Sequence, residues 1–97
     1  IPNSVTNMAN TFYDCTNLVN APIIGSSVTT MYQTFFNCYN LSGDITILST
    51  NVSNLQLCFY GCNASIPKNL RCPSGSNTYN LAINVCDGKN GVTVVAY

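Results

Sequence analysis

An internal repeat constrains the fold of this chain more than any other feature. The chemical order of residues 1–18 returns at residues 24–41 and 48–62, first after 23 and then after 24 residues. A period of about 20 to 50 residues is typical of a solenoid, in which each coil buries its apolar side only by stacking on its neighbours. The equivalent positions are Ile1, Ile24 and Leu48; Val5, Val28 and Val52; Met8, Met31 and Leu55; Phe12, Phe35 and Phe59; and Cys15, Cys38 and Cys62. We therefore predict that the three Phe side chains stack in a common core.

Two short elements are predicted within each copy. Phe12 and Cys15 lie three residues apart, a spacing that places both on one side of a helical turn. The apolar pairs that follow alternate with polar residues, as in a strand with one buried face. These pairs, predicted to point inward, are Ala21 and Ile23, Ile45 and Ile47, and Leu70 and Cys72. Each copy is expected to add one strand to a parallel ladder, and Pro22 predicts that the first strand is irregular or lies at an edge.

The repeats end after Cys72, and a different pattern follows. Ser76 is a suitable N-cap for a helix whose predicted face is Tyr79, Ala82 and Ile83, and the dipeptide at residues 87–88 is a stop signal. Residues 92–97 (VTVVAY) are predicted to form a final strand. The chain is thus divided into a solenoid at residues 1–72, with repeats 1–23, 24–47 and 48–72, and a helix-strand cap at residues 73–97.

These motifs resemble the BspA-like leucine-rich repeats of bacterial surface proteins. The shared elements are VTNM, FYDCTNL and APII in the first copy, VTTM, FFNCYNL and ITIL in the second, and CPSGSNTYNLAI in the terminal unit. The chain departs from the family pattern at Pro22, Cys58 and Cys72. The resemblance implies an α/β, β-rich solenoid of the leucine-rich-repeat type, with about three coils. It also implies a non-enzymatic extracellular module for surface adhesion that binds a protein or glycan partner. The alternative is a structural or receptor-binding component of a phage tail, fibre or other extracellular assembly.

Composition narrows the set of partners. Charged residues make up 6% of the chain, against about 25% in an average domain, and the net charge is zero. Without a basic run, binding to nucleic acid or to an anionic membrane lacks its usual charge pattern. No apolar run approaches the roughly 18 residues that cross a bilayer, so membrane insertion is not expected. We expect the chain to be an excised piece with upstream coils missing, located outside the cell, on its surface or on a virion. Self-assembly with neighbouring coils or subunits is compatible with this expectation.

Residues for catalysis are scarce. The chain has no His and no Glu, and its three acidic residues are Asp14, Asp44 and Asp87, in different segments. General acid and base chemistry needs two titratable groups in one place, so neither an enzyme nor a cofactor is predicted.

The six cysteines allow three interpretations. Cys15, Cys38 and Cys62 share one repeat position, which favours a buried column of unbridged thiols. A disulfide between Cys72 and Cys86 is a second option. A metal site is a third option. Cys58 and Cys62 would form it with Cys72 and Cys86, although the chain has no His and no paired CxxC spacing.

The candidate binding site lies on the outer face of the predicted strands. Residues between the inward-pointing pairs must point outward, and polar residues flank them. The predicted partner-binding residues are Asn20, Pro22, Asp44, Thr46, Asn69 and Arg71.

Overall fold

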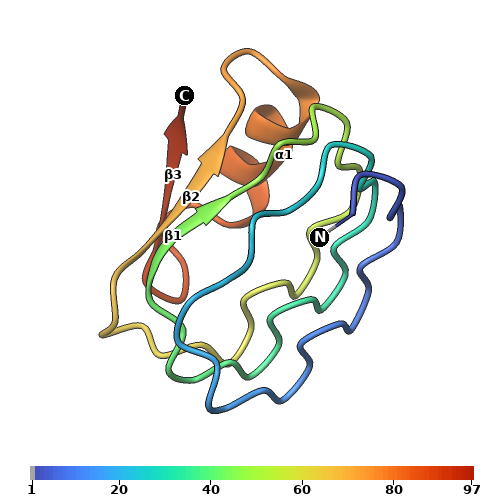
Figure 1. Cartoon of the computed structure of the whole chain (residues 1–97). Helices are drawn as coiled ribbons and strands as arrows, with labels where there is room; N and C mark the ends of the chain where they lie inside the picture. The colour runs from blue at the N-terminus through green and yellow to red at the C-terminus, as the bar shows by residue number, and fades with distance from the viewer. Residues whose placement is uncertain (1) are drawn as a thin grey trace.

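The computed structural model describes residues 2–97 and shows a small α/β protein measuring 28 × 24 × 19 Å. Three parallel strands form one sheet in the order β1-β2-β3, and one helix lies between β2 and β3 in the sequence. The elements are β1 (Gly43–Thr46), β2 (Lys68–Cys72), α1 (Asn77–Val85) and β3 (Val92–Ala96) (Figure 1). The predicted α/β class and parallel strand pairing are confirmed. The role predicted for Ile1 lies outside the described residues.

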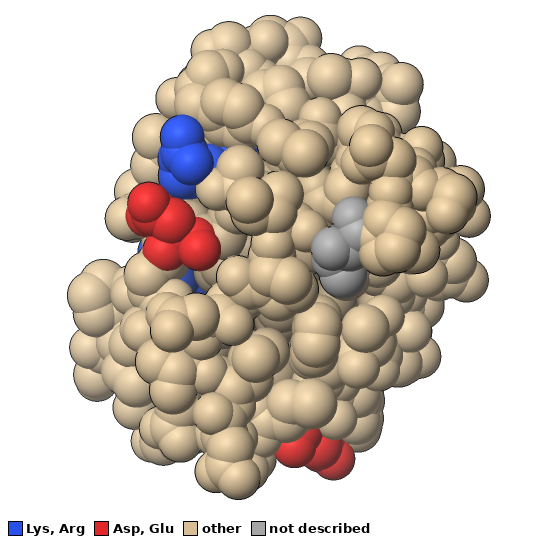
Figure 2. Space-filling view, viewed as in Figure 1, with Lys and Arg blue, Asp and Glu red and all other residues tan. Residues whose placement is uncertain are grey.

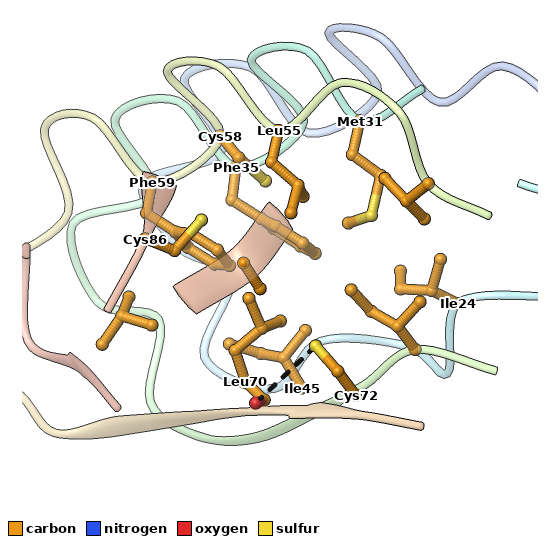
Figure 3. Close-up of a cluster of buried hydrophobic side chains, with 14 of the residues drawn as sticks. Ile24, Met31, Phe35, Ile45, Leu55, Cys58, Phe59, Leu70, Cys72 and Cys86 are labelled. Atoms are coloured by element: carbon orange, nitrogen blue, oxygen red, sulfur yellow. Dashed lines mark hydrogen bonds between the residues drawn. The ribbon is translucent and has the colours of Figure 1, made fainter. Parts of the chain in front are cut away.

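The strands bury alternate side chains, as their sequence pattern predicts. Ile45 of β1 lies beside Leu70 of β2, and Leu70 lies beside Val94 of β3. Ile45 and Leu70 are fully buried, and Val94 is almost so. Figure 3 shows these side chains of β1 and β2 pointing from the strands toward Phe35 and Leu55 on the opposite side of the core.

Opposite the sheet, equivalent segments of the three copies run side by side (Figure 1). We call residues 8–14, 31–37 and 55–61 the turn segments. Alternate N–H groups of each of the first two turn segments donate to carbonyl oxygens of the next copy, at 2.7–3.1 Å. The copies are therefore joined by regular backbone hydrogen bonds as well as by their apolar side chains.

The turn segments are runs of β-turns, and the predicted helical turn at Phe12–Cys15 is wrong. The N–H of Cys15 donates to the carbonyl of Phe12 at 3.0 Å, and Asp14 between them has a φ of 60°. A positive φ at the third residue of a turn is the mark of a type II turn. Two positions in each turn segment have this left-handed conformation. They are Asn10 and Asp14, Gln33 and Asn37, and Leu57 and Gly61. Asn, Asp and Gly adopt this conformation readily, so pairing with the neighbouring copy is needed to explain it only at Gln33 and Leu57.

Leu57 is the least suited of these residues to its backbone conformation. Its φ is 56°, and left-handed backbone costs about 1–2 kcal/mol for most residues but little for Gly or Asn. We expect Leu57→Asn to raise the free energy of unfolding by about 1 kcal/mol, measured by urea denaturation. Gln56→Asn is the control, because the neighbouring Gln56 does not have a positive φ. Equal effects of the two variants would contradict the prediction.

Two aromatic ladders connect the turn segments. The rings of Phe12, Phe35 and Phe59 stack inside the core with centroids 5.5 Å apart at both steps, which confirms the predicted Phe stack. A second ladder lies on the outside, where Phe36 stacks between two tyrosine rings. Phe35 is fully buried, whereas Phe12 is only half-buried because no copy covers it among residues 2–97.

The first copy does not form the predicted strand at Ala21–Ile23. An isolated parallel bridge joins Ile24 to Ile47, and Ile24 is fully buried while Ile23 is 59% exposed. The predicted inward position is therefore wrong by one residue. Pro22 has no N–H for a ladder hydrogen bond, which agrees with the expected irregularity.

The predicted cap elements are present, with one correction. Ser76 caps α1, and its Oγ accepts a hydrogen bond from the N–H of Tyr79 at 3.0 Å. Ala82 is fully buried and Tyr79 is half-buried, but Ile83 is 38% exposed and does not belong to the buried face. Thr78 takes its place, because its Oγ1 donates to the carbonyl of Ser49 at 2.7 Å and ties the helix to the third copy.

Within residues 2–97, no helix has the length and apolar character needed to cross a membrane.

Candidate functional site

The strand-derived part of the predicted site is assembled on the outer face of the sheet. Asp44 lies beside Asn69, whose Nδ2 donates to Asp44 Oδ1 at 3.1 Å. Thr46 lies beside Arg71, whose Nη1 donates to Thr46 Oγ1 at 2.9 Å. Figure 2 shows positive and negative groups gathered on the side where Figure 1 places the strands, on a surface otherwise almost free of charge.

The two predicted residues from the first copy are placed differently. Asn20 is exposed, but Pro22 is half-buried, so its predicted outward position is wrong. Because Ile24 pairs with Ile47, the residue next to Thr46 in register is Ile23. An exposed isoleucine thus occupies the outer face where a proline was expected.

Sequence reasoning missed the contribution of β3. Val95 lies beside Arg71 and is 38% exposed. Tyr97 places its ring 5.0 Å from the Arg71 guanidinium carbon and donates its hydroxyl to the carbonyl of Ile47 at 2.6 Å. The predicted strand at residues 92–97 was the available signal, since side chains alternate along a strand and Val95 and Tyr97 then lie on the face opposite Val94.

We call the row of Ile23, Thr46, Arg71 and Val95, together with Tyr97, the outer row. Arg71 is held in place by a hydroxyl on one side and an aromatic ring on the other. A cation over a tyrosine face is stabilised by about 0.5–1 kcal/mol at exposed sites and loses side-chain freedom. The outer row can therefore offer an oriented guanidinium beside exposed apolar surface.

The thiol column differs from its prediction at one end. Cys38 donates to the carbonyl of Phe12 at 3.0 Å and Cys62 to that of Phe35 at 3.2 Å, so each thiol reaches back to the preceding copy. Both are buried, and all six cysteines are free, Cys72 and Cys86 included. Cys15 is only half-buried, because its copy is not covered by another among the described residues.

Burial keeps these thiols protonated. Burial raises the pKa of Cys38 to about 12 and that of Cys86 to about 12, and the neighbouring cysteines add to both shifts. It also raises the pKa of Cys58, with Cys86 as the next cause. Since the thiolate is the reactive form, these cysteines are not suited to nucleophilic chemistry. Among residues 2–97, no group of three or more Cys or Asp side chains is placed to hold a metal ion.

A shallow pocket of about 400 Å³ lies between the third turn segment and the end of α1. Its walls are residues 55–60 on one side and Val85, Cys86, Lys89 and Asn90 on the other. Figure 3 shows Cys86 next to Phe59 at this junction. No sequence motif indicated this pocket, because the two walls lie far apart in the chain.

Lys68 is a buried cation with only backbone partners. It is 1% exposed, and its Nζ donates to the carbonyls of Asn63, Ile66 and Asn90 at 3.0, 2.8 and 2.7 Å. Gly91 leaves room for the Lys68 ammonium group, since a Cβ at Gly91 would lie 3.0 Å from Nζ and 2.5 Å from the Ile66 carbonyl oxygen. Burial lowers the pKa of the Lys68 ammonium. The side chain thus joins the third copy to the loop before β3.

Replacing Lys68 by methionine should therefore be destabilising. Lys68→Met keeps an unbranched side chain but removes Nζ, so the carbonyl oxygens of Ile66 and Asn90 lose their donor, whereas that of Asn63 still accepts from the N–H of Ile66. Each orphaned buried acceptor costs about 1–3 kcal/mol. Allowing for relief of the buried charge, we expect a loss of about 3 kcal/mol in urea denaturation at pH 7. Lys89→Met, at an exposed lysine, should change the free energy of unfolding by less than about 0.5 kcal/mol. Comparable losses in both variants would refute the structural role of Lys68.

Comparison of the chain with protein-family models, curated proteins and solved structures found no match in any of the three.

Proposed function

We propose that the chain is a leucine-rich-repeat solenoid of about three coils, with repeats 1–23, 24–47 and 48–72 and a cap at residues 73–97. The regular hydrogen bonds between turn segments and the Phe stack support this interpretation. The sequence resemblance to BspA-like repeats points to the same architecture. We further propose that it acts outside the cell as a non-enzymatic adhesion module that binds a protein or glycan.

The observation that carries this proposal is the composition of the outer row. Apolar side chains are exposed next to an oriented guanidinium, on a chain that has only three Lys and Arg residues. Ile23 is 59% exposed and Tyr97 is 44% exposed. Aromatic residues and arginine are enriched at protein interfaces, and both also suit contacts with sugars. Asp44 and Asn69 add hydrogen-bonding groups along one edge of this row.

A double variant tests the proposed binding face. Asp44→Asn with Arg71→Gln removes both charges and keeps a polar side chain at each surface position, so thermal stability should stay within about 3 °C of the parent. Binding of the fluorescently labelled protein to host cells and to glycan-coated surfaces should fall at least tenfold if the outer row is the contact. Asp14→Asn, on the turn side of the molecule, is the control and should bind like the parent. Undiminished binding of the double variant would exclude the outer row as the adhesive site.

The alternative function is a structural part of a phage tail, fibre or other assembly. One observation favours it: the carbonyls of Ala9, Thr11 and Tyr13 accept no hydrogen bond from residues 2–97, although the equivalent carbonyls of the later copies do. The Tyr13 side chain, first in the outer ladder, is 43% exposed. A surface of this kind fits stacking on a further coil. Sedimentation velocity distinguishes the two functions, because an assembly component should self-associate as its concentration rises and an adhesion module should remain monomeric.

A further inference from the structure

A row of backbone donors in the third turn segment has no partner in the described chain. In the second copy, the N–H groups of residues 31, 33, 35 and 37 each donate to a carbonyl of the third copy. Their equivalents are the N–H groups of Leu55, Leu57, Phe59 and Gly61, and none of these pairs with an acceptor among residues 2–97. We call these four groups the donor row. The same geometry that joins the copies thus leaves one set of donors available.

Three residues of the donor row border the pocket beside α1. Leu55, Leu57 and Phe59 all line it. A backbone N–H without a partner in the chain is open to an acceptor that enters this space, and each hydrogen bond so formed adds modestly to affinity. A volume of about 400 Å³ lies within the range of ligand-binding pockets.

The structure also shows which chemistry the donor row accepts. In the two filled examples, the acceptors are carbonyl oxygens of alternate residues in the neighbouring copy, 2.7–3.1 Å from the donors. Lys89 at the opposite wall supplies a cation, and Leu57, Tyr60 and Val85 supply apolar surface. Charge complementarity therefore favours a segment that carries a carboxylate.

We propose that this pocket binds an acidic peptide segment. Its alternate carbonyls accept hydrogen bonds from the donor row, and one of its carboxylates pairs with the Lys89 ammonium. Addition of a peptide to open backbone groups is an established mode of recognition, in which main-chain hydrogen bonds provide affinity and side-chain contacts provide specificity. The site is separate from the outer row and does not depend on the function proposed for it.

A second copy of the chain is the less suitable occupant. It has matching acceptors, because the carbonyls of Ala9, Thr11 and Tyr13 are free of partners among residues 2–97. However, the inner side of the donor row is already covered, since Phe59 is 3% exposed and packs in the same core as Cys86 and Val85. A whole turn segment with its own inner aromatic ring could not stack there without displacing α1. A short peptide segment needs only the outer part of the pocket.

Titration followed by NMR of the ¹⁵N-labelled chain tests the proposal. The probe is a heptapeptide of alternating threonine and aspartate, blocked at both ends. We expect saturable downfield shifts of the amide protons of Leu55, Leu57 and Phe59, which report new hydrogen bonds. The same peptide with lysine in place of aspartate should bind at least tenfold more weakly, and Lys89→Gln should weaken binding of the acidic peptide about three- to tenfold.

Pocket-filling variants provide the matched control. Val85→Phe places a ring in the pocket and should abolish the shifts, whereas Ile83→Phe, at an exposed position of α1 outside the pocket, should leave them unchanged. If Val85→Phe does not fold, the charge dependence in Lys89→Gln decides the question. Absence of shifts in the parent, or equal shifts with sodium acetate alone, overturns the peptide site. Concentration-dependent shifts of the same amides without any peptide would replace the proposed occupant by a second copy.

Discussion

Raising the pH from 8 to 10 is expected to lower the free energy of unfolding by an amount on the order of 5 kcal/mol. The cause is the set of buried thiols. Burial raises the pKa of Cys72 to about 11 from an ordinary value of 9.0, and that of Cys38 to about 12. The other cysteines whose pKa is raised are Cys58, Cys62 and Cys86.

The sign follows from which state ionises first. The unfolded chain loses its thiol protons near pH 9, while the folded chain keeps them until the pH reaches the raised pKa values. The stabilisation that each protonated thiol provides is therefore fully present below pH 9. It is lost as the pH rises from there up to the raised pKa of the folded state, which is about 11 for Cys72 and about 12 for Cys38. Each thiol removes about 1.4 kcal/mol per pH unit within that window. Lys68 acts in the opposite direction, because its pKa is lowered in the folded chain, but it is one group against five.

Urea midpoints between pH 7 and pH 10.5 under reducing conditions measure this effect. Because small domains are stabilised by only about 5–15 kcal/mol, the folded state should be largely lost near the upper end of that range. Cys58→Thr is the matched variant, since threonine occupies the equivalent positions 11 and 34 of the other copies. It should reduce the slope of stability against pH above 9 by about one fifth. A midpoint that stays constant from pH 7 to pH 10 would show that the thiols do not control alkaline stability.

Replacing Phe35 by alanine is expected to lower the free energy of unfolding by about 3–5 kcal/mol. Phe35 is fully buried, and its ring stacks on Phe12 and on Phe59 with centroids 5.5 Å away on both sides. The truncation removes contacts with two copies at once and leaves a cavity in the middle of the core. Urea denaturation at pH 7 measures the loss directly.

The outer ladder offers the control for this prediction. Tyr60 also stacks on a neighbouring ring, with centroids 5.3 Å apart, but it is 57% exposed. Tyr60→Ala should therefore cost about 1 kcal/mol, because only the stacking energy and part of the area are lost. A loss below about 1.5 kcal/mol for Phe35→Ala would mean that the inner ladder is not the main source of cohesion between the copies.

The candidate site was predicted only in part. The alternation in residues 43–47 and 68–72 placed Asp44, Thr46, Asn69 and Arg71 on one face, and the register of β1 and β2 brings them together in pairs. Which face of a strand is polar can be read from the sequence, because side chains alternate with a period of two. The face on which Pro22 lies could not be read from the sequence, because a one-residue shift of register exchanges the two faces. Only the pairing of Ile24 with Ile47 decides the register.

The sequence by itself determined that equivalent residues of the copies meet. The 23- and 24-residue spacings were sufficient to predict the Phe stack, the shared position of three thiols and the end of the repeats before Ser76. The reason is that stacked copies must bury the apolar side chains at equivalent repeat positions. These features depend on periodicity, which is a property of the chain alone.

The backbone conformation between these repeated positions depends on the tertiary structure. Leu57 and Gln33 adopt left-handed backbone that neither residue favours, because each turn segment must align alternate N–H or carbonyl groups with its neighbour. The ring of Tyr97 reaches Arg71 across the sheet, and the walls of the α1 pocket come from segments some thirty residues apart. Such contacts arise from hydrogen bonds and packing between distant segments, and no local pattern of side chains encodes them.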